Sequence, residues 1–155
     1  EKIITGDIPC SKIYEDEHTF VFLDINPNSL GHTLVIPKSP SVDIFELPPN
    51  LAGPYMKTIQ KVANAIKKGL SADGIKIIMN NGEAAGQDIF HLHTHVIPRY
   101  TDDSFSFDIH TTYESDEHKE DIAEKISDSR RTRRGDPLKM RQMICRCDPL
   151  LKSRH

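Results

Sequence analysis

The sequence has few cysteines and no long apolar run, and both shortages exclude broad classes of protein. Its three cysteines are Cys10, Cys145 and Cys147, and only one residue separates the last two, which is too close for an ordinary disulfide. This set argues against an extracellular disulfide scaffold and favours a reducing compartment. No stretch approaches the roughly 18 apolar residues of a membrane-spanning helix, and no secretory signal opens the chain. We therefore expect a cytoplasmic protein without membrane contact.

The chain is long enough for one folded domain, and its charge is unevenly spread. It has 155 residues, of which 37% are hydrophobic. Residues 1–129 hold 11 Lys/Arg and 21 Asp/Glu, whereas residues 130–155 hold 9 and 2. We expect residues 1–129 to form an acidic domain, which is a poor partner for nucleic acid. We expect residues 130–155 to be a poorly ordered basic tail, with phosphate contact as the alternative.

Local patterns predict strands, one main helix and one weaker helix. β-branched and aromatic runs between turn signals indicate strands at 19–23, 33–36, 75–79 and 90–98. Apolar residues three and four positions apart predict the main helix at 51–70 and a weaker helix at about 116–127. Because short links favour antiparallel pairing, the pattern predicts an α+β fold, with an antiparallel sheet and helices on one face.

Three histidines alternate along the last predicted strand. Side chains of a strand alternate between its faces, so His91, His93 and His95 would project from one face at about 7 Å steps. Three interpretations are open: core packing, a zinc site completed by His32, or a site that handles phosphate. In the third, one imidazole attacks phosphorus while its neighbours and backbone N–H groups hold the oxygens. The small-residue loop at 84–86 allows close backbone approach to an anion.

The histidine motif resembles that of a known family. His91–Ile97 is similar to the signature of the histidine triad (HIT) superfamily, three histidines alternating with apolar residues, with Thr94 as a mild departure. Residues 24–27 and 31–38 resemble the first half of the family's domain, and residues 80–82 and 86–87 resemble its loop before the triad. The resemblance covers about residues 2–100. We identify the chain as a HIT-superfamily protein of the bacterial, Hint-like kind.

This resemblance implies a fold, a reaction and a set of roles. HIT domains are α+β folds with an antiparallel sheet, a main helix and a C-terminal helix on the sheet, usually paired as homodimers. They hydrolyse or transfer nucleotides at the α-phosphate. His93 would attack phosphorus and form a covalent nucleotidyl-histidine, from which water releases the nucleoside monophosphate. His95 would contact the phosphate, and His91 and His32 would orient the nucleophile, with no metal or other cofactor.

The resemblance also implies a site for a purine nucleotide. Asp24 would accept the ribose hydroxyls, with a turn-forming role as the alternative. Asp88 stands where the Hint branch usually has a serine that helps to protonate the leaving group. We expect its carboxylate to turn away from the phosphate, and a protonated acid is the alternative. The remaining expected contacts are Ile3, Phe22 and Ile25 at the base, with Phe22 alternatively a core residue, and Asn80, Gly86 and Gln87 near the phosphate.

The expected activity is that of a phosphoramidase-like nucleotide hydrolase. Nucleoside phosphoramidates such as adenosine 5′-phosphoramidate are the substrates that the Hint-like motifs favour. A fragile-histidine-like hydrolase of dinucleoside polyphosphates is an alternative compatible with Pro98–Arg99, and so is a nucleotide-binding adaptor with little turnover. Many bacterial members bind structural zinc through a Cys-x-x-Cys pair. Cys10 has no such partner nearby, so we expect no metal site unless residues before Glu1 supply one.

Overall fold

The chain divides into two units, which are described separately. The structure is a computed structural model that describes residues 2–103 and 111–131, with the division between Phe105 and Ser106. The second unit contains α2 (Asp116–Arg131), which begins where the sequence predicts and ends four residues later. Acidic residues in its first turn favour this start, since they face the positive end of the helix dipole. Residues 130–131 of the predicted basic tail therefore belong to α2, and residues 132–155 lie outside the described residues.

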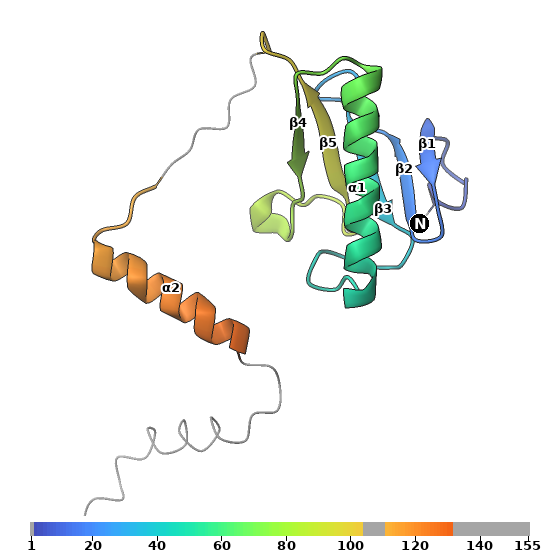
Figure 1. Ribbon diagram of the computed structural model, residues 1–155. Coiled ribbons are helices and arrows are strands. Elements are labelled where there is room, and N and C mark those ends of the chain that lie inside the picture. Colours follow the sequence, from blue (N-terminus) through green and yellow to red (C-terminus); the bar gives the residue numbers. More distant parts are fainter. Residues whose placement is uncertain (1, 104–110, 132–155) are drawn as a thin grey trace, which may run out of the picture. The chain divides into compact units, whose positions relative to one another are not determined.

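The first unit is built on an antiparallel sheet in the order β1-β2-β3-β5-β4, shown in Figure 1. Every neighbouring pair of strands is antiparallel, so the predicted α+β class is confirmed. In the described residues no helix is both long and apolar enough to cross a bilayer. The strands are β1 (Lys12–Glu15), β2 (Thr19–Leu23), β3 (Thr33–Pro37), β4 (Gly74–Ile78) and β5 (Thr94–Arg99).

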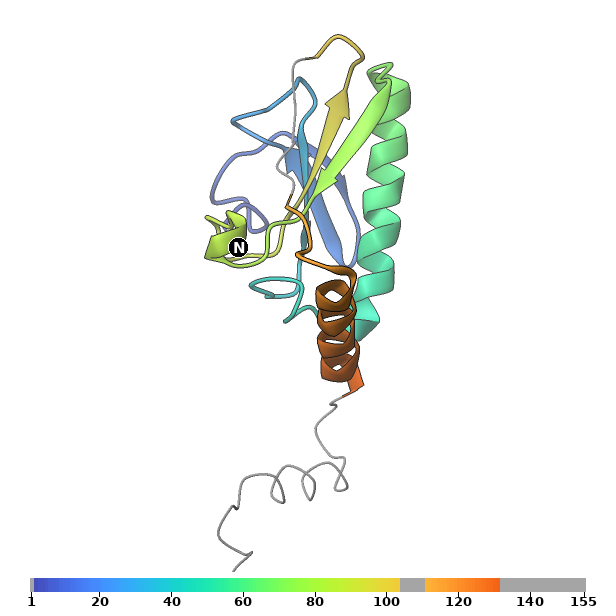
Figure 2. The ribbon, with the colours of Figure 1, turned by 90° about the vertical axis from the view of Figure 1, so that its left-hand side faces the viewer.

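The helix α1 (Pro49–Gly69) covers one face of the sheet, as Figure 2 shows. Val21, Val35 and Val96 are fully buried in the core cluster that α1 closes, and Ile59 is among its partners from the helix. Because side chains alternate along a strand, the neighbours of each valine in its own strand face the opposite side of the sheet. The second face carries its own apolar cluster of Phe20, Phe22 and Ile36, with Ile3, Ile4, Cys10 and Leu34 packed against it.

A buried hydroxyl pair explains the departure at Thr94. The Tyr55 hydroxyl of α1 donates to the Val35 carbonyl at 2.8 Å and lies 2.9 Å from the Thr94 hydroxyl. Since Tyr55 has one hydroxyl proton, Thr94 is the donor in the second bond. Burial raises the pKa of Tyr55 far above its usual range. A purely apolar side chain at residue 94 would leave the Tyr55 oxygen with one bond fewer.

Two predictions about strands were wrong. The sequence pattern missed β1, a short edge strand in which only Ile13 and Tyr14 favour strand structure. The last strand was expected at 90–98, but β5 begins at Thr94, opposite Val35. The Leu92 N–H donates instead to the Ser41 carbonyl at 2.7 Å, so residues just before β5 bond to a loop. Two of the three histidines therefore precede the strand and are not placed by its pleat.

Candidate active site

His93 is held in one tautomer by its own chain. Its ring is buried, and Nδ1 lies 2.7 Å from the carbonyl oxygen of His91. A carbonyl only accepts hydrogen bonds, so Nδ1 carries the ring proton and Nε2 is bare in the neutral ring. A bare imidazole nitrogen on a fixed ring has the form that a nucleophile requires.

His91 anchors the segment that supplies this carbonyl. Its Nε2 lies 2.9 Å from the Pro37 carbonyl at the end of β3, to which it must donate. The bond joins residues that are 54 positions apart in the chain. Because β5 begins only at Thr94, this side-chain bond joins residue 91 to β3 where no backbone pairing of strands does so. The His91 side chain thereby fixes the backbone from which His93 is oriented.

His32 and His95 form a chain of hydrogen bonds that starts at a backbone amide. The Asn28 N–H donates to His32 Nδ1 at 3.2 Å, so neutral His32 carries its proton on Nε2. That nitrogen lies 2.9 Å from His95 Nδ1 and donates to it. The proton of neutral His95 is then on Nε2, where it is available to a ligand. The rings of His93 and His95 are 5.0 Å apart between centroids and their planes meet at 79°, so the edge of one ring faces the other.

The surroundings of His32 and His95 favour the neutral form of both rings. Burial lowers the pKa of His32, against the opposing charge of Asp24. Burial also lowers the pKa of His95, as do His93 and His32, while Asp24 and Asp88 act in the opposite direction. Neutral rings are what the chain of hydrogen bonds needs, since a doubly protonated His95 has no acceptor for His32.

Asp24 lies between the turn after β2 and the imidazole pair. One carboxylate oxygen, Oδ1, accepts the Asn26 N–H at 2.9 Å, which is the turn-forming role. The other, Oδ2, is 3.6 Å from His32 Nδ1 and 4.0 Å from His95 Nδ1. The carboxylate therefore borders the site and keeps one oxygen free of hydrogen bonds to the turn.

The group of Asp24, His32 and His95 is compact enough to be tested as a metal site, since one ligand atom from each lies within 4.8 Å of the others. The hydrogen bonds oppose this use. A neutral imidazole binds a metal through its bare nitrogen. The bare nitrogen of His32 is occupied by the Asn28 N–H, and that of His95 by His32. The three residues fit a hydrogen-bonded relay better than a metal centre.

Gln87 holds the loop before the triad in place. From the sequence, its side chain is expected near the phosphate. In the structure its amide is buried and bonded to three backbone groups. Oε1 accepts the Gly82 N–H at 2.7 Å, and Nε2 donates to the carbonyls of Val42 at 2.6 Å and Ile89 at 3.1 Å. These bonds leave it little capacity for a ligand, so we assign Gln87 to loop positioning.

The rest of this loop has a similar local order. The Asn80 amide donates to the Gly86 carbonyl at 3.2 Å, and Gly86 has a φ of 81°, which favours glycine. Gly86 follows the single 3₁₀ turn η1 (Glu83–Ala85) and donates its N–H back to Glu83. Asp88 comes directly after the buried Gln87, and its side chain is exposed.

The expected base contacts separate into two groups. Phe22 is buried in the apolar cluster on the second face of the sheet, with Ile3 packed against that cluster. This placement agrees with the alternative role of Phe22 as a core residue. Ile25 is 86% exposed and belongs to neither core cluster. It could contact a base only as an exposed edge of the site.

Sequence reasoning suggests a backbone carbonyl as the partner of the nucleophilic ring but does not identify which residues supply the groups that set the tautomers. They are the Asn28 N–H and the carbonyls of His91 and Pro37, all of them backbone atoms. Every residue carries a carbonyl and nearly every residue an N–H, so no side-chain pattern marks these three. Only the strand pairing and the turn after β2 bring them to the rings.

The chain matches one family model and many known proteins. Residues 5–102 match the HIT domain. The relative named "Protein hit" from Bacillus subtilis (strain 168) is 50% identical over 99 residues, which are 64% of this chain and 68% of that protein. Adenylylsulfatase HINT3 of Arabidopsis thaliana is 45% identical over 98 residues, 63% of this chain and 50% of that protein. The crystal structure of a HIT family member from Bacillus subtilis has a TM-score of 0.77 at 42% identity, with 82% of this chain and 92% of that chain covered.

The domain consists of a five-stranded antiparallel sheet that is covered by a helix on one face and carries clustered histidines on the other. The matched range contains the whole sheet and the segment His91–Ile97. The chain belongs to the HIT family, which confirms the resemblance drawn from its motifs.

Proposed function

We propose that the protein is a nucleotidyl hydrolase or transferase that acts at the α-phosphate of purine nucleotide conjugates. The observation that carries this proposal is the state of His93, whose Nδ1 is protonated toward the His91 carbonyl at 2.7 Å. Its Nε2 is therefore a ready nucleophile in the neutral ring. The named activity of the relative HINT3, an adenylylsulfatase, supports chemistry on adenylyl groups.

The reaction takes place in two displacements. His93 Nε2 forms a bond to the α-phosphorus while the bond to the leaving group breaks, and the leaving group takes the electron pair and a proton from solvent. Water then attacks the phosphorus, loses a proton, and releases the nucleoside monophosphate from His93. The His95 Nε2–H donates to a phosphoryl oxygen in both steps, which stabilises the charge that develops there. Positioning by His91 and His32 lowers the cost of reaching this geometry.

The nucleoside is assigned to the second face of the sheet, beside β2. Asp24 Oδ2 is free to accept the ribose hydroxyls, and Ile3, which packs against the buried cluster of Phe22, offers an apolar surface to the purine. Ile25 adds an exposed contact at its edge. On the other side of the triad, Asn80 and Gly86 shape the loop near the phosphate.

The experiment is to incubate the protein with adenosine 5′-phosphoramidate and, separately, with diadenosine polyphosphates in the presence of a chelator. We expect AMP from the phosphoramidate without added metal. Faster release from the polyphosphates would favour the fragile-histidine-like alternative. Tight AMP binding with turnover of neither substrate would show a nucleotide-binding adaptor. Activity that the chelator removes and zinc restores would contradict the hydrogen-bonded relay at His32 and His95.

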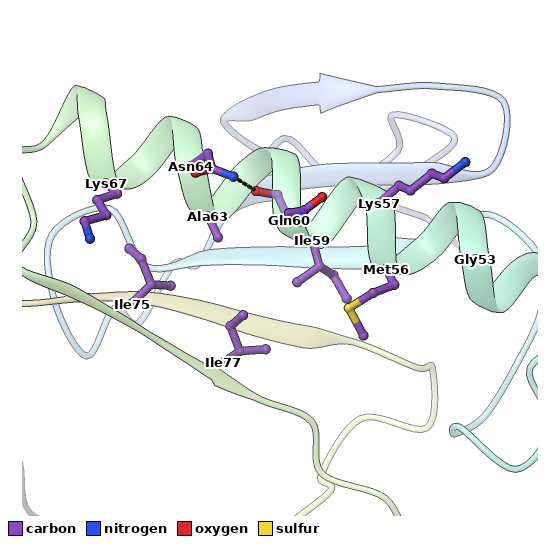
Figure 3. A pocket seen from close by; sticks show the side chains of 10 residues that line it. All are labelled: Gly53, Met56, Lys57, Ile59, Gln60, Ala63, Asn64, Lys67, Ile75 and Ile77. Atoms are coloured by element: carbon purple, nitrogen blue, oxygen red, sulfur yellow. Dashed lines mark hydrogen bonds between the residues drawn. The ribbon is translucent and has the colours of Figure 1, made fainter.

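We also propose that the protein forms a homodimer through β4 and α1. β4 is an edge strand, and a groove of about 560 Å³ runs between it and α1, as Figure 3 shows. Met56 and Ile77 line the groove and are more than half exposed, an unfavourable state for apolar side chains in water. Light scattering should give a dimer for the native chain and a monomer for Ile77→Glu. Leu30→Glu, at an exposed residue outside the groove, is the control.

A further inference from the structure

The nucleophile of the proposed reaction lies in a short segment outside the strand pairing. Residues 91–93 precede β5, whose pairing with β3 ends at Thr94. Two bonds hold the front of this segment, since the ring of His91 and the Leu92 N–H donate to the end of β3 and to the loop after it. The back of the segment continues directly into Thr94. The orientation of the His93 ring therefore also depends on what fixes Thr94.

The Tyr55 hydroxyl joins α1 to the last pair of residues between β3 and β5. It donates to the Val35 carbonyl at 2.8 Å and accepts from the Thr94 hydroxyl at 2.9 Å. Val35 and Thr94 lie opposite each other in the register of the two strands, against which α1 packs, as Figure 1 shows. All three residues are buried, and hydrogen bonds shielded from water are stronger than those at a surface. The pair at which the strands separate is thus fixed from the helix.

Thr94 and His93 are adjacent, and their side chains leave the backbone in different directions. The Thr94 side chain points to α1, whereas the His93 ring lies against that of His95, with Nδ1 2.7 Å from the His91 carbonyl. A rotation of the backbone at Thr94 would therefore turn the His93 ring relative to that carbonyl. A hydrogen bond weakens steeply when its angle falls below about 120°, so a small rotation loosens the constraint on the tautomer of His93.

We propose that Tyr55 is a positioning residue for the nucleophile and acts through Thr94. The hydroxyl of Tyr55 fixes the end of the strand pairing, and this end holds the His93 ring with Nδ1 toward the His91 carbonyl and with Nε2 bare. The inference rests on the proposed function, because the step that it assists is the attack of His93 on phosphorus. Tyr55 is buried on the helix side of the sheet and adds no contact to the nucleotide. Its loss should therefore lower kcat and leave nucleotide binding unchanged.

The test removes one hydroxyl at a time and measures the single-turnover release of AMP from adenosine 5′-phosphoramidate. Tyr55→Phe and Thr94→Val should each slow release about tenfold, with the dissociation constant of AMP within about twofold of the native value. Thr94→Ser retains the hydroxyl and should keep the rate within about threefold of the native rate. Because the two hydroxyls act as one unit, the double variant should be no slower than the slower single variant.

Thr58→Val is the matched control on the same helix. Thr58 lies three residues after Tyr55, and its buried hydroxyl bonds to Thr19 and Asp16 at the start of β2. Loss of this hydroxyl should also lower the melting temperature. Release of AMP, measured well below the melting temperature of every variant, should stay near the native rate in Thr58→Val. Equal slowing in Thr58→Val and Tyr55→Phe would overturn the proposal, because the loss would then follow from destabilisation alone.

NMR spectra of the histidine rings separate the failure of this inference from the failure of the proposed function. The native chain should show His93 protonated at Nδ1. Tyr55→Phe should show a mixture with the form protonated at Nε2, and Thr58→Val should not. If the native chain released AMP from none of the conjugates, the proposed function would be rejected, and the ring signals of His93 would decide the positioning role by themselves. An unchanged rate of release in Tyr55→Phe or, without any release, unchanged ring signals would overturn that role.

Discussion

The two faces of the sheet hold their side chains by different means. On the face toward α1, Val21, Val35 and Val96 are buried by apolar packing against residues such as Ile59. On the other face, His95 and the neighbouring His93 are fixed by hydrogen bonds that end at backbone groups. Apolar packing is nearly independent of direction, whereas a hydrogen bond also fixes where a proton lies. The first face therefore supplies stability, and the second supplies a defined protonation state.

The comparison predicts that damage to the second face removes activity and spares the fold. His93→Ala should reduce AMP release by more than about a thousandfold, or about 4 kcal/mol, because it removes the bare imidazole nitrogen proposed to attack phosphorus. The melting temperature of His93→Ala and its binding of AMP should change little. Release of AMP is measured by chromatography, and binding of AMP by calorimetry. Residual activity within tenfold of the native rate would reject His93 as the nucleophile.

Damage to the first face should have the opposite result. Ile59→Ala removes a side chain that is 1% exposed and should lower the free energy of unfolding by about 2–5 kcal/mol. AMP release per folded molecule, measured well below the melting temperature, should stay near the native rate. Lys68→Ala, at an exposed residue of the same helix outside the groove, should cost less than about 0.5 kcal/mol in denaturant unfolding. A selective loss of rate in Ile59→Ala would show that the two faces are coupled.

A smaller effect is expected where the second face meets the nucleoside. Asp24→Ala should weaken binding of ribonucleotides about tenfold more than that of 2′-deoxyribonucleotides, because the lost acceptor serves the ribose hydroxyls. Competition assays with AMP and 2′-deoxy-AMP measure the difference. Equal weakening of both nucleotides would assign Asp24 to the turn and to the imidazole pair alone.

The smallest effect concerns pH and the neutral imidazoles. Burial and neighbouring imidazoles lower the pKa of His95, so below about pH 6.5 the unfolded chain binds a proton that the folded chain resists. Stability from this source is complete above that pH and decreases as the pH falls. Denaturant unfolding between pH 7.5 and 5 should show the decrease, and His95→Asn should show less of it.

The partly buried carboxylate of Asp16 is not expected to contribute in this pH range. The desolvation of Asp16 is outweighed by hydrogen bonds from Thr19, His18 and Tyr14, which lower its pKa to about 2. Its stabilising effect is lost only as the pH falls from about 4 toward 2. If the stability of His95→Asn and of the native chain decreased equally as the pH falls, the pH dependence would have to come from another histidine.

The sequence by itself determined the family, the helix α1 and most of the strands of the first unit. The apolar spacing of α1, the β-branched runs of β2 and β3 and the alternation of His91, His93 and His95 are local patterns, which periodicity reads directly. The short edge strand β1 was not predicted, because its charged ends break the alternation of apolar and polar residues that indicates a strand.

Only the tertiary structure decided where β5 begins, how Gln87 is used and which nitrogen of each histidine carries the proton. Each depends on a backbone partner distant in sequence, such as Val42 for Gln87 and Pro37 for His91. All residues present nearly the same backbone groups, so the sequence does not show which of them a side chain will meet. That choice is made when strand pairing and packing bring one carbonyl or N–H within about 3 Å of a ring nitrogen.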